Sequence, residues 1–219
     1  MRRFLTTLLS LGCITPALAG EAMLLWDNYL TPPLGHDRVS GRASERNTDV
    51  PDAWTVDDAL FDTAVEVREL RWIGLRDETS AYASADVILL DSQFQQVELL
   101  VNLPYTATPL EMLLGYEVYE GRVGDLSIEL PAGHYYVGAR LVDSGSGRNF
   151  VATTGNGQIG GLTTGAFRCA TFGVPEWTLV GEFATPTDYA YQVYGVPEPA
   201  GFVMAAAGAL VIVRMRPRG

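Results

Sequence analysis

Four aspartates in the first third of the chain are the residues best suited to bind a metal ion. Asp57 and Asp58 are adjacent, Asp62 follows shortly after them, and Asp27 lies on an earlier segment that we expect on a neighbouring strand. Carboxylate oxygens, together with carbonyl oxygens, are the ligands that Ca²⁺ prefers in proteins. Their spacing differs from that of an EF-hand loop. These residues are expected to form an ordinary solvated acidic loop, and a structural Ca²⁺ site is the alternative.

Residues that catalyse hydrolysis are present but do not form a recognisable motif. His36 and His134 fit none of the zinc-hydrolase patterns, and Ser146 lacks the G-x-S-x-G frame of a hydrolase nucleophile. The G-x-G-x-x-G match at 155–160 runs into more glycine and threonine, which favours a glycine-rich loop over a dinucleotide site. Cys169 has no histidine near it in sequence and is expected to be a small buried side chain. We expect no enzyme activity and no cofactor, with a structural Ca²⁺ ion as the alternative to the second. A secreted hydrolase that uses His134 or two carboxylates is an alternative function.

Aromatic side chains provide a third candidate site, a surface on which sugar rings stack. The chain contains 4 tryptophans and 10 tyrosines, most of which we expect in the core. Tyr136 and Tyr194 fall on the faces of two predicted strands opposite the buried ones, so they are expected to be exposed. A carbohydrate-binding module for an exopolysaccharide is therefore an alternative function.

Alternating apolar and polar residues predict the strands that position these side chains. This alternation is typical of strands with one buried and one wetter face, and it occurs in segments 97–103, 126–130, 135–141 and 189–193. Apolar runs predict further strands at 86–90 and 65–75, the second with a bulge near Glu69, where the alternation slips. Short strands separated by turn residues predict an all-β fold, an antiparallel β-sandwich or jelly roll.

The connections between these strands give three further expectations. Pro131–Gly133 is expected to close a hairpin between its flanking strands. The segment Pro109–Gly115 has a weak helical pattern, and the polar segment Thr31–Pro51 is expected to be one long loop.

The first 19 residues have the pattern of a secretory signal peptide. Two arginines follow Met1, a largely apolar stretch comes next, and Ala17 and Ala19 form a small-x-small cleavage site before Gly20. A twin-arginine signal and a lipoprotein signal at Cys13 are the alternatives. The first lacks the usual residue between its arginines and Phe4, and the second has Ser10 in place of an aliphatic residue and a very short apolar region.

The last 24 residues combine a Pro-Glu-Pro motif, an apolar segment and a basic end. The prolines cannot continue a helix, so a helix is expected to begin after them. Residues 200–213 carry no charge and span roughly 21 Å as a helix, against a bilayer core of about 30 Å. The positive-inside rule places the arginines that follow on the cytoplasmic side. The pattern predicts a short C-terminal transmembrane helix, and a buried terminal helix is the alternative.

This tail resembles the PEP-CTERM sorting signal. Its recognition motif would be Val196, Pro197, Glu198 and Pro199, and its orienting cluster would be Arg214, Arg216 and Arg218, which here are interrupted by other residues. The resemblance implies an exosortase-type membrane protease as partner. It also implies transient anchoring in the inner membrane, followed by transfer to the cell surface or the medium of bacteria that make a polysaccharide matrix.

The middle of the chain bears a looser resemblance to the β-sandwich domains of secreted PEP-CTERM proteins. It rests on the order of short motifs at 26–28, 53–60, 67–74, 130–136 and 188–195, and it implies architecture only. We therefore expect three parts, which are a signal peptide at 1–19, one β-sandwich domain at 20–195 and a sorting signal at 196–219.

Charge narrows the choice of partners. The domain at 20–195 carries 25 acidic residues against 10 arginines and no lysine, a net charge of −15. Such an acidic surface repels the phosphates of nucleic acids, so we do not expect nucleic acid as a partner. The expected role is that of an exported structural or adhesive component of the extracellular matrix, as found in biofilms.

Overall fold

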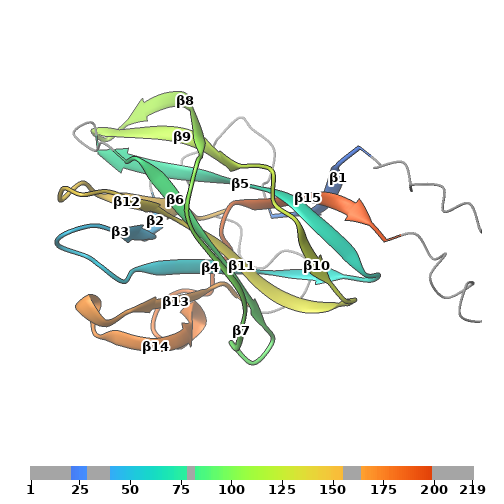
Figure 1. Cartoon of the computed structure of the whole chain (residues 1–219). Coiled ribbons are helices and arrows are strands. Elements are labelled where there is room, and N and C mark those ends of the chain that lie inside the picture. Colours follow the sequence, from blue (N-terminus) through green and yellow to red (C-terminus); the bar gives the residue numbers. More distant parts are fainter. Residues whose placement is uncertain (1–20, 29–39, 78–81, 155–163, 199–219) are drawn as a thin grey trace, which may run out of the picture.

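The computed structural model describes residues 21–28, 40–77, 82–154 and 164–198, which form an all-β fold of two sheets (Figure 1). In the first, 8-stranded sheet, β5 is the longest strand, and it pairs with β15 and β12 along one edge and with β9 and β10 along the other. The strands of this sheet are β1 (Met23–Asp27), β2 (Gly41–Ala43), β5 (Val65–Asp77), β8 (Thr106–Leu113), β9 (Tyr116–Val123), β10 (Ile128–Leu130), β12 (Asn149–Ala152) and β15 (Tyr191–Pro197).

The second, 7-stranded sheet runs in the order β14-β13-β4-β11-β6-β7, and β3 pairs with the end of β11. The β3–β11 pair is parallel and the other pairs are antiparallel. Its strands are β3 (Glu45–Arg46), β4 (Trp54–Phe61), β6 (Ser84–Asp91), β7 (Gln96–Leu103), β11 (Gly133–Val142), β13 (Ala166–Cys169) and β14 (Val174–Leu179). Two 3₁₀ turns, Ala170–Phe172 and Val180–Glu182, flank β14.

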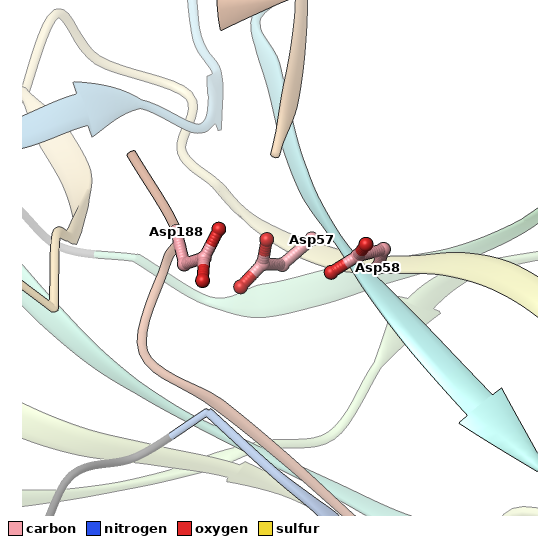
Figure 2. Close-up of side chains that lie close together, drawn as sticks. All are labelled: Asp57, Asp58 and Asp188. Atoms are coloured by element: carbon pink, nitrogen blue, oxygen red, sulfur yellow. The ribbon is translucent and has the colours of Figure 1, made fainter. Parts of the chain in front are cut away.

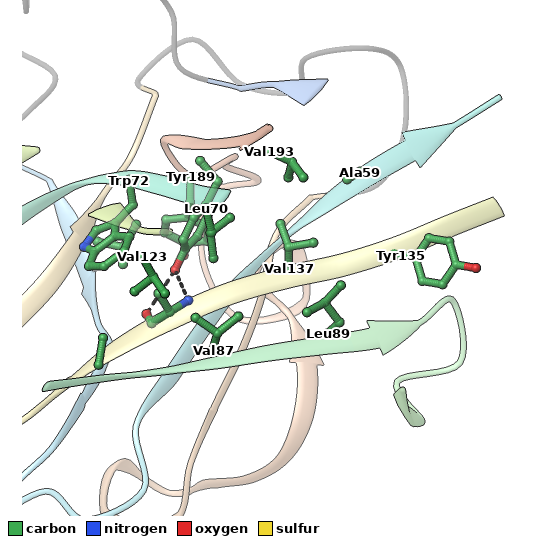
Figure 3. Packing of buried hydrophobic residues seen from close by; sticks show 14 of the residues in the cluster. Ala59, Leu70, Trp72, Val87, Leu89, Val123, Tyr135, Val137, Tyr189 and Val193 are labelled. Carbon is green, nitrogen blue, oxygen red and sulfur yellow. Dashed lines mark hydrogen bonds between the residues drawn. The ribbon is translucent and has the colours of Figure 1, made fainter. Parts of the chain in front are cut away.

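The main core lies between the two sheets. Figure 3 shows Leu70 and Trp72 of the first sheet near Val137 and Val87 of the second, and all four are almost fully buried. Each apolar side chain of this size contributes about 1.5–3 kcal/mol by leaving water. The layer is therefore the main source of the fold's stability.

One tyrosine joins the sheets by hydrogen bonds through this core. The fully buried hydroxyl of Tyr191 on β15 accepts a hydrogen bond of 3.1 Å from the Ala139 N–H of β11, and it lies 2.9 Å from the Thr55 carbonyl oxygen of β4, to which it donates. Burial is the main cause that raises the pKa of Tyr191, so the hydroxyl keeps its proton. The last strand is thus fastened to the opposite sheet as well as to its own.

Most of the predicted strands are confirmed, and so is the bulge on β5. Tyr194 pairs with Glu69, and the next residue, Gly195, pairs with Val67, which leaves Arg68 as the extra residue. The strand at 97–103 is confirmed as β7, but only part of its predicted buried face packs on the core. Leu103 packs there as predicted, whereas Val97 and Val101 are exposed. Register shifts against β6 break the alternation, and Leu100 packs against the core instead.

Three expectations for the connections are wrong wholly or in part. The segment 109–115 is not helical: β8 covers most of it, and Pro109 is tolerated there because β8 is an edge strand with a register shift beside the proline. The turn at Pro131–Gly133 does not close a hairpin, since β10 belongs to the first sheet and β11 to the second. The expected loop at 31–51 contains β2 and β3, and its residues 31–39 lie outside the described residues.

The last strand includes the beginning of the Pro-Glu-Pro motif. Val196 and Pro197 pair with Glu66 and Val65, and the Glu198 N–H donates a hydrogen bond of 2.9 Å to the Ala64 carbonyl oxygen. The predicted signal peptide with Ala17 and Ala19, Pro199, the apolar tail and the terminal arginines lie outside the described residues. In the part of the chain that is described, no helix is long and apolar enough to cross a membrane.

Candidate functional site

Three buried aspartates converge where β4 passes the beginning of β13. Asp57 and Asp58 belong to β4, and Asp188 precedes β15. Each contributes one carboxylate oxygen to a group in which these atoms all lie within 4.8 Å of one another, and all three residues are fully buried. Figure 2 shows the Asp57 carboxylate between those of Asp188 and Asp58. We call these three residues the aspartate cluster.

Strand pairing explains why residues so distant in sequence meet here. β13 pairs with β4 only as far as Val56, so this edge of β4 is open at the next residue, Asp57. The segment that contains Asp188 runs beside this open edge, and its Tyr189 N–H donates a hydrogen bond of 2.8 Å to Asp57 Oδ2. The cluster therefore depends on the tertiary fold.

A fourth polar residue, Asn28, reaches the cluster from the end of β1. Its Nδ2 donates a hydrogen bond of 2.7 Å to Asp57 Oδ2 and lies 3.4 Å from the Asp58 carbonyl oxygen. Asn28 is fully buried, and its Oδ1 has no hydrogen-bond partner among the described residues. This oxygen is a buried acceptor close to the Asp57 carboxylate.

The electrostatics of Asp57 differ from those of a paired buried acid. Both of its donors, the Asn28 amide and the Tyr189 N–H, are neutral and bind the same oxygen, and its Oδ1 has no hydrogen-bond partner in the described part of the chain. Burial raises the pKa of Asp57 well above its ordinary value, and the neighbouring charges of Asp188 and Asp58 raise it further.

Asp86, elsewhere in the second sheet, shows how this fold neutralises a buried acid. Its Oδ2 accepts hydrogen bonds of 2.9 Å from Arg46 and from Arg140, and its Oδ1 accepts one of 2.8 Å from the Asn102 N–H. Burial alone would raise the pKa of Asp86, but these hydrogen bonds bring it below its ordinary value. Asp86 and Asp57 are both fully buried, but only Asp86 is paired with arginines. The donors to Asp57 are neutral.

Only two of the four predicted metal ligands belong to the cluster. Asp27 is exposed and accepts a hydrogen bond of 3.1 Å from Gln192, and Asp62 is exposed beyond the end of β4. Neither is among the residues that converge, so the structure does not bring the four predicted ligands together. Asp188 and Asn28 take their places, and the sequence spacing gave no signal for either.

The predicted sugar-stacking surface is also corrected. Tyr136 is only 2% exposed, because the outer face of β11 is covered by residues such as Phe94, whose ring centroid lies 4.6 Å away. Tyr194 is half-buried, and the Arg71 guanidinium lies over its ring at 4.5 Å. The two rings do not form an exposed platform, so the observation that favoured a carbohydrate-binding module is lost.

His134 lies beside the cluster, with its Nε2 at 3.5 Å from Asp58 Oδ2. Burial lowers the pKa of His134, which favours the neutral imidazole at pH 7. A serine hydrolase would also need a hydroxyl nucleophile, and no described serine hydrogen-bonds to this imidazole. The carboxylates of Asp57 and Asp58 are fully buried and out of reach of a polymer in this conformation.

Cys169 is buried, as expected, and its thiol lies 3.3 Å from Asp52 Oδ1. Burial raises the pKa of this thiol, and Asp52 raises it further, so the thiolate form is disfavoured. This environment suits a structural side chain rather than a nucleophile.

A shallow depression of about 440 Å³ lies on the first sheet, lined by Ala22, Arg68, Glu69, Arg122, Asp125 and Leu126. The Glu69 carboxylate, almost buried, is held between Arg122 and Arg71. Glu69 and Arg122 of the lining are therefore engaged with each other, and Arg68 pairs with Glu66 outside it.

Comparisons with known proteins return no match, whether against family models, curated proteins or solved structures.

Proposed function

We propose that this chain is an exported β-sandwich protein that serves as a structural or adhesive component of the cell surface or extracellular matrix, and that it is not an enzyme. The proposal rests on the signal-like N-terminus and on the sorting-signal pattern at 196–219. The all-β fold and the strongly acidic composition are compatible with it, because net charge far from zero keeps an extracellular domain soluble.

The observation that carries the proposal is the way the motif continues the folded domain. Val196 and Pro197 pair with β5, whereas Pro197 and Glu198 are exposed. Exposure of Pro197 and Glu198 supports recognition of the motif by a membrane protease. Cleavage beyond Glu198 would leave every strand of both sheets intact.

Cleavage earlier in the chain would damage the domain. Removal of β15 would take away Tyr191, whose hydroxyl joins the two sheets, and the strand that separates β1 from β5. We therefore propose that an exosortase-type protease processes the chain after Glu198, and that the domain is released whole.

The proposal is tested by fractionating a host that makes the protein and its exosortase-type machinery. Replacing the motif glutamate, Glu198→Ala, is expected to leave most of the protein in the inner-membrane fraction, while the unaltered chain reaches the surface or medium. Glu176→Ala changes another exposed glutamate on β14 and is the control that should behave as the unaltered chain. Equal release of all three would overturn the sorting proposal.

A further inference from the structure

We propose that the aspartate cluster and Asn28 form a buried binding site for a divalent cation, with Ca²⁺ as the preferred ion. The ligands would be carboxylate oxygens of Asp57, Asp58 and Asp188 and the carbonyl oxygen of Asn28. The ion would join the end of β1, the middle of β4 and the segment before β15. This inference is independent of how the protein is exported.

The first support is the separation of the oxygen atoms. Ca²⁺ binds oxygen ligands at about 2.3–2.6 Å, so two ligands on opposite sides of the ion lie about 4.6–5.2 Å apart. In the cluster, one oxygen from each aspartate lies within 4.8 Å of the others. A single ion can therefore contact all three without a change in the backbone.

The second support is the unpartnered oxygen of Asn28. Its Nδ2 is 2.7 Å from Asp57 Oδ2, and the nitrogen and oxygen of a planar amide are about 2.2 Å apart. Oδ1 must then lie within about 5 Å of that carboxylate. It is fully buried and accepts no hydrogen bond from any described residue, and a buried acceptor without a partner costs free energy. A cation would use this acceptor.

The third support is the charge of Asp57. A buried carboxylate is expensive unless it is paired, protonated or bound to a metal. Asp86 is paired with two arginines, whereas the donors to Asp57 are neutral. A divalent cation among these oxygens would supply the positive charge that the neutral donors to Asp57 do not.

The donor set selects the ion. Four oxygen ligands and no thiolate suit a hard cation, and Ca²⁺ tolerates irregular coordination better than Mg²⁺, which retains several waters. Because the ligand atoms are buried, room for a large hydration shell is small. We therefore expect Ca²⁺ to bind more tightly than Mg²⁺.

The test uses the full chain, freed of metal with a chelator and kept in mild detergent. Binding is followed by titration calorimetry with Ca²⁺ and by luminescence of Tb³⁺, a Ca²⁺ substitute that nearby aromatic rings such as Tyr189 sensitise. At a free Ca²⁺ concentration about ten times its dissociation constant, Ca²⁺ should raise the Tm of the protein by about 3–6 °C.

Two variants remove ligands, and one is a matched control. Asp57→Asn and Asp188→Asn should each weaken the affinity by about 100-fold or more, since even residues that only support metal ligands cost about 10–100-fold when replaced. Asp62→Asn removes the same charge from an exposed position close by and should leave binding unchanged. Two ligand variants are used so that the test can still be read if one of them does not fold.

Three results would overturn the proposal. The first is that calorimetry detects no Ca²⁺ binding by the folded, unaltered chain. The second is that Ca²⁺ leaves Tm unchanged. The third is that Asp62→Asn and Asp57→Asn lose binding equally. The last result would mean that Ca²⁺ binds loosely to the acidic surface. Tighter binding of Mg²⁺ than of Ca²⁺ would contradict the choice of ion.

Discussion

The side-chain amide of Asn28 donates a hydrogen bond of 2.7 Å to Asp57, and so fastens the end of β1 to β4 of the opposite sheet. The pair lies beside Asp58 and Asp188 in a fully buried site. This contact links the segment after the predicted signal peptide to the middle of the sandwich. Protonation of Asp57, or a cation bound to it, is therefore expected to change the stability of the contact between β1 and β4.

The stability of the metal-free protein should depend on pH through Asp57. Because the pKa of Asp57 is raised in the folded state, the folded chain binds this proton more tightly than the unfolded chain does. The free energy of unfolding should then fall as pH rises from the ordinary aspartate pKa through the raised one. Several ionisable groups surround Asp57 and act on it directly or through a neighbour. They are Asp58, Asp188, His134, Tyr189, Tyr191 and Arg42.

The Asp57→Asn variant isolates this contribution, because an amide oxygen can still accept both hydrogen bonds but cannot titrate. Urea unfolding in chelator at about pH 5 and about pH 8 should show the unaltered chain losing stability relative to Asp57→Asn at the higher pH. A constant difference between the two proteins across this range would contradict a raised pKa. Saturating Ca²⁺ should stabilise the unaltered chain most at the higher pH.

Loss of the Tyr191 hydroxyl should weaken the contact between the sheets. Tyr191→Phe leaves the buried Ala139 N–H without this acceptor, and we expect a loss of about 1–3 kcal/mol in the free energy of unfolding. Tyr194→Phe is the matched control on the same strand, since its hydroxyl is half-buried and bonds only to Gln192 in the described contacts. Equal losses of unfolding free energy in the two variants would show that the hydrogen bond between the sheets contributes no more than the one at the surface.

Removing an arginine from Asp86 should be far more damaging than removing one from the surface. Arg140→Gln leaves the fully buried Asp86 with Arg46 as its remaining cation, and a loss of about 3–5 kcal/mol is expected by analogy with broken buried pairs. Arg68→Gln breaks a pair with Glu66 that is partly exposed on both sides, and should cost about 0–1 kcal/mol. Similar losses in urea unfolding would contradict the role given to Asp86.

Local patterns were sufficient to predict the class of fold and several of its strands. Alternation over 135–141 indicated β11, and the slip in phase near Glu69 located the bulge on β5, because both features depend on neighbouring residues. The partners of each strand depend on the whole chain. Pro131–Gly133 therefore looked like a hairpin turn, although it joins two strands in different sheets.

The candidate site was only half predictable for the same reason. Asp57 and Asp58 stood out as adjacent acids, but Asp188 reaches them through the pairing of the last strand, 130 residues later by position. Alternation on β11 predicted one wet face, so Tyr136 was expected in solvent. Its burial comes from Phe94 and its neighbours, which cover the outer face and lie in a separate segment.

The most direct test of the proposed function is the intact mass of the protein recovered from the surface or medium of its native host. The account predicts a mass that lacks residues 1–19 and the apolar tail with its arginines, and that retains the chain through Glu198 with all of β15. A mass that retains Arg214, Arg216 and Arg218 would contradict processing of the tail. A mass that ends before Val196 would contradict release of an intact domain.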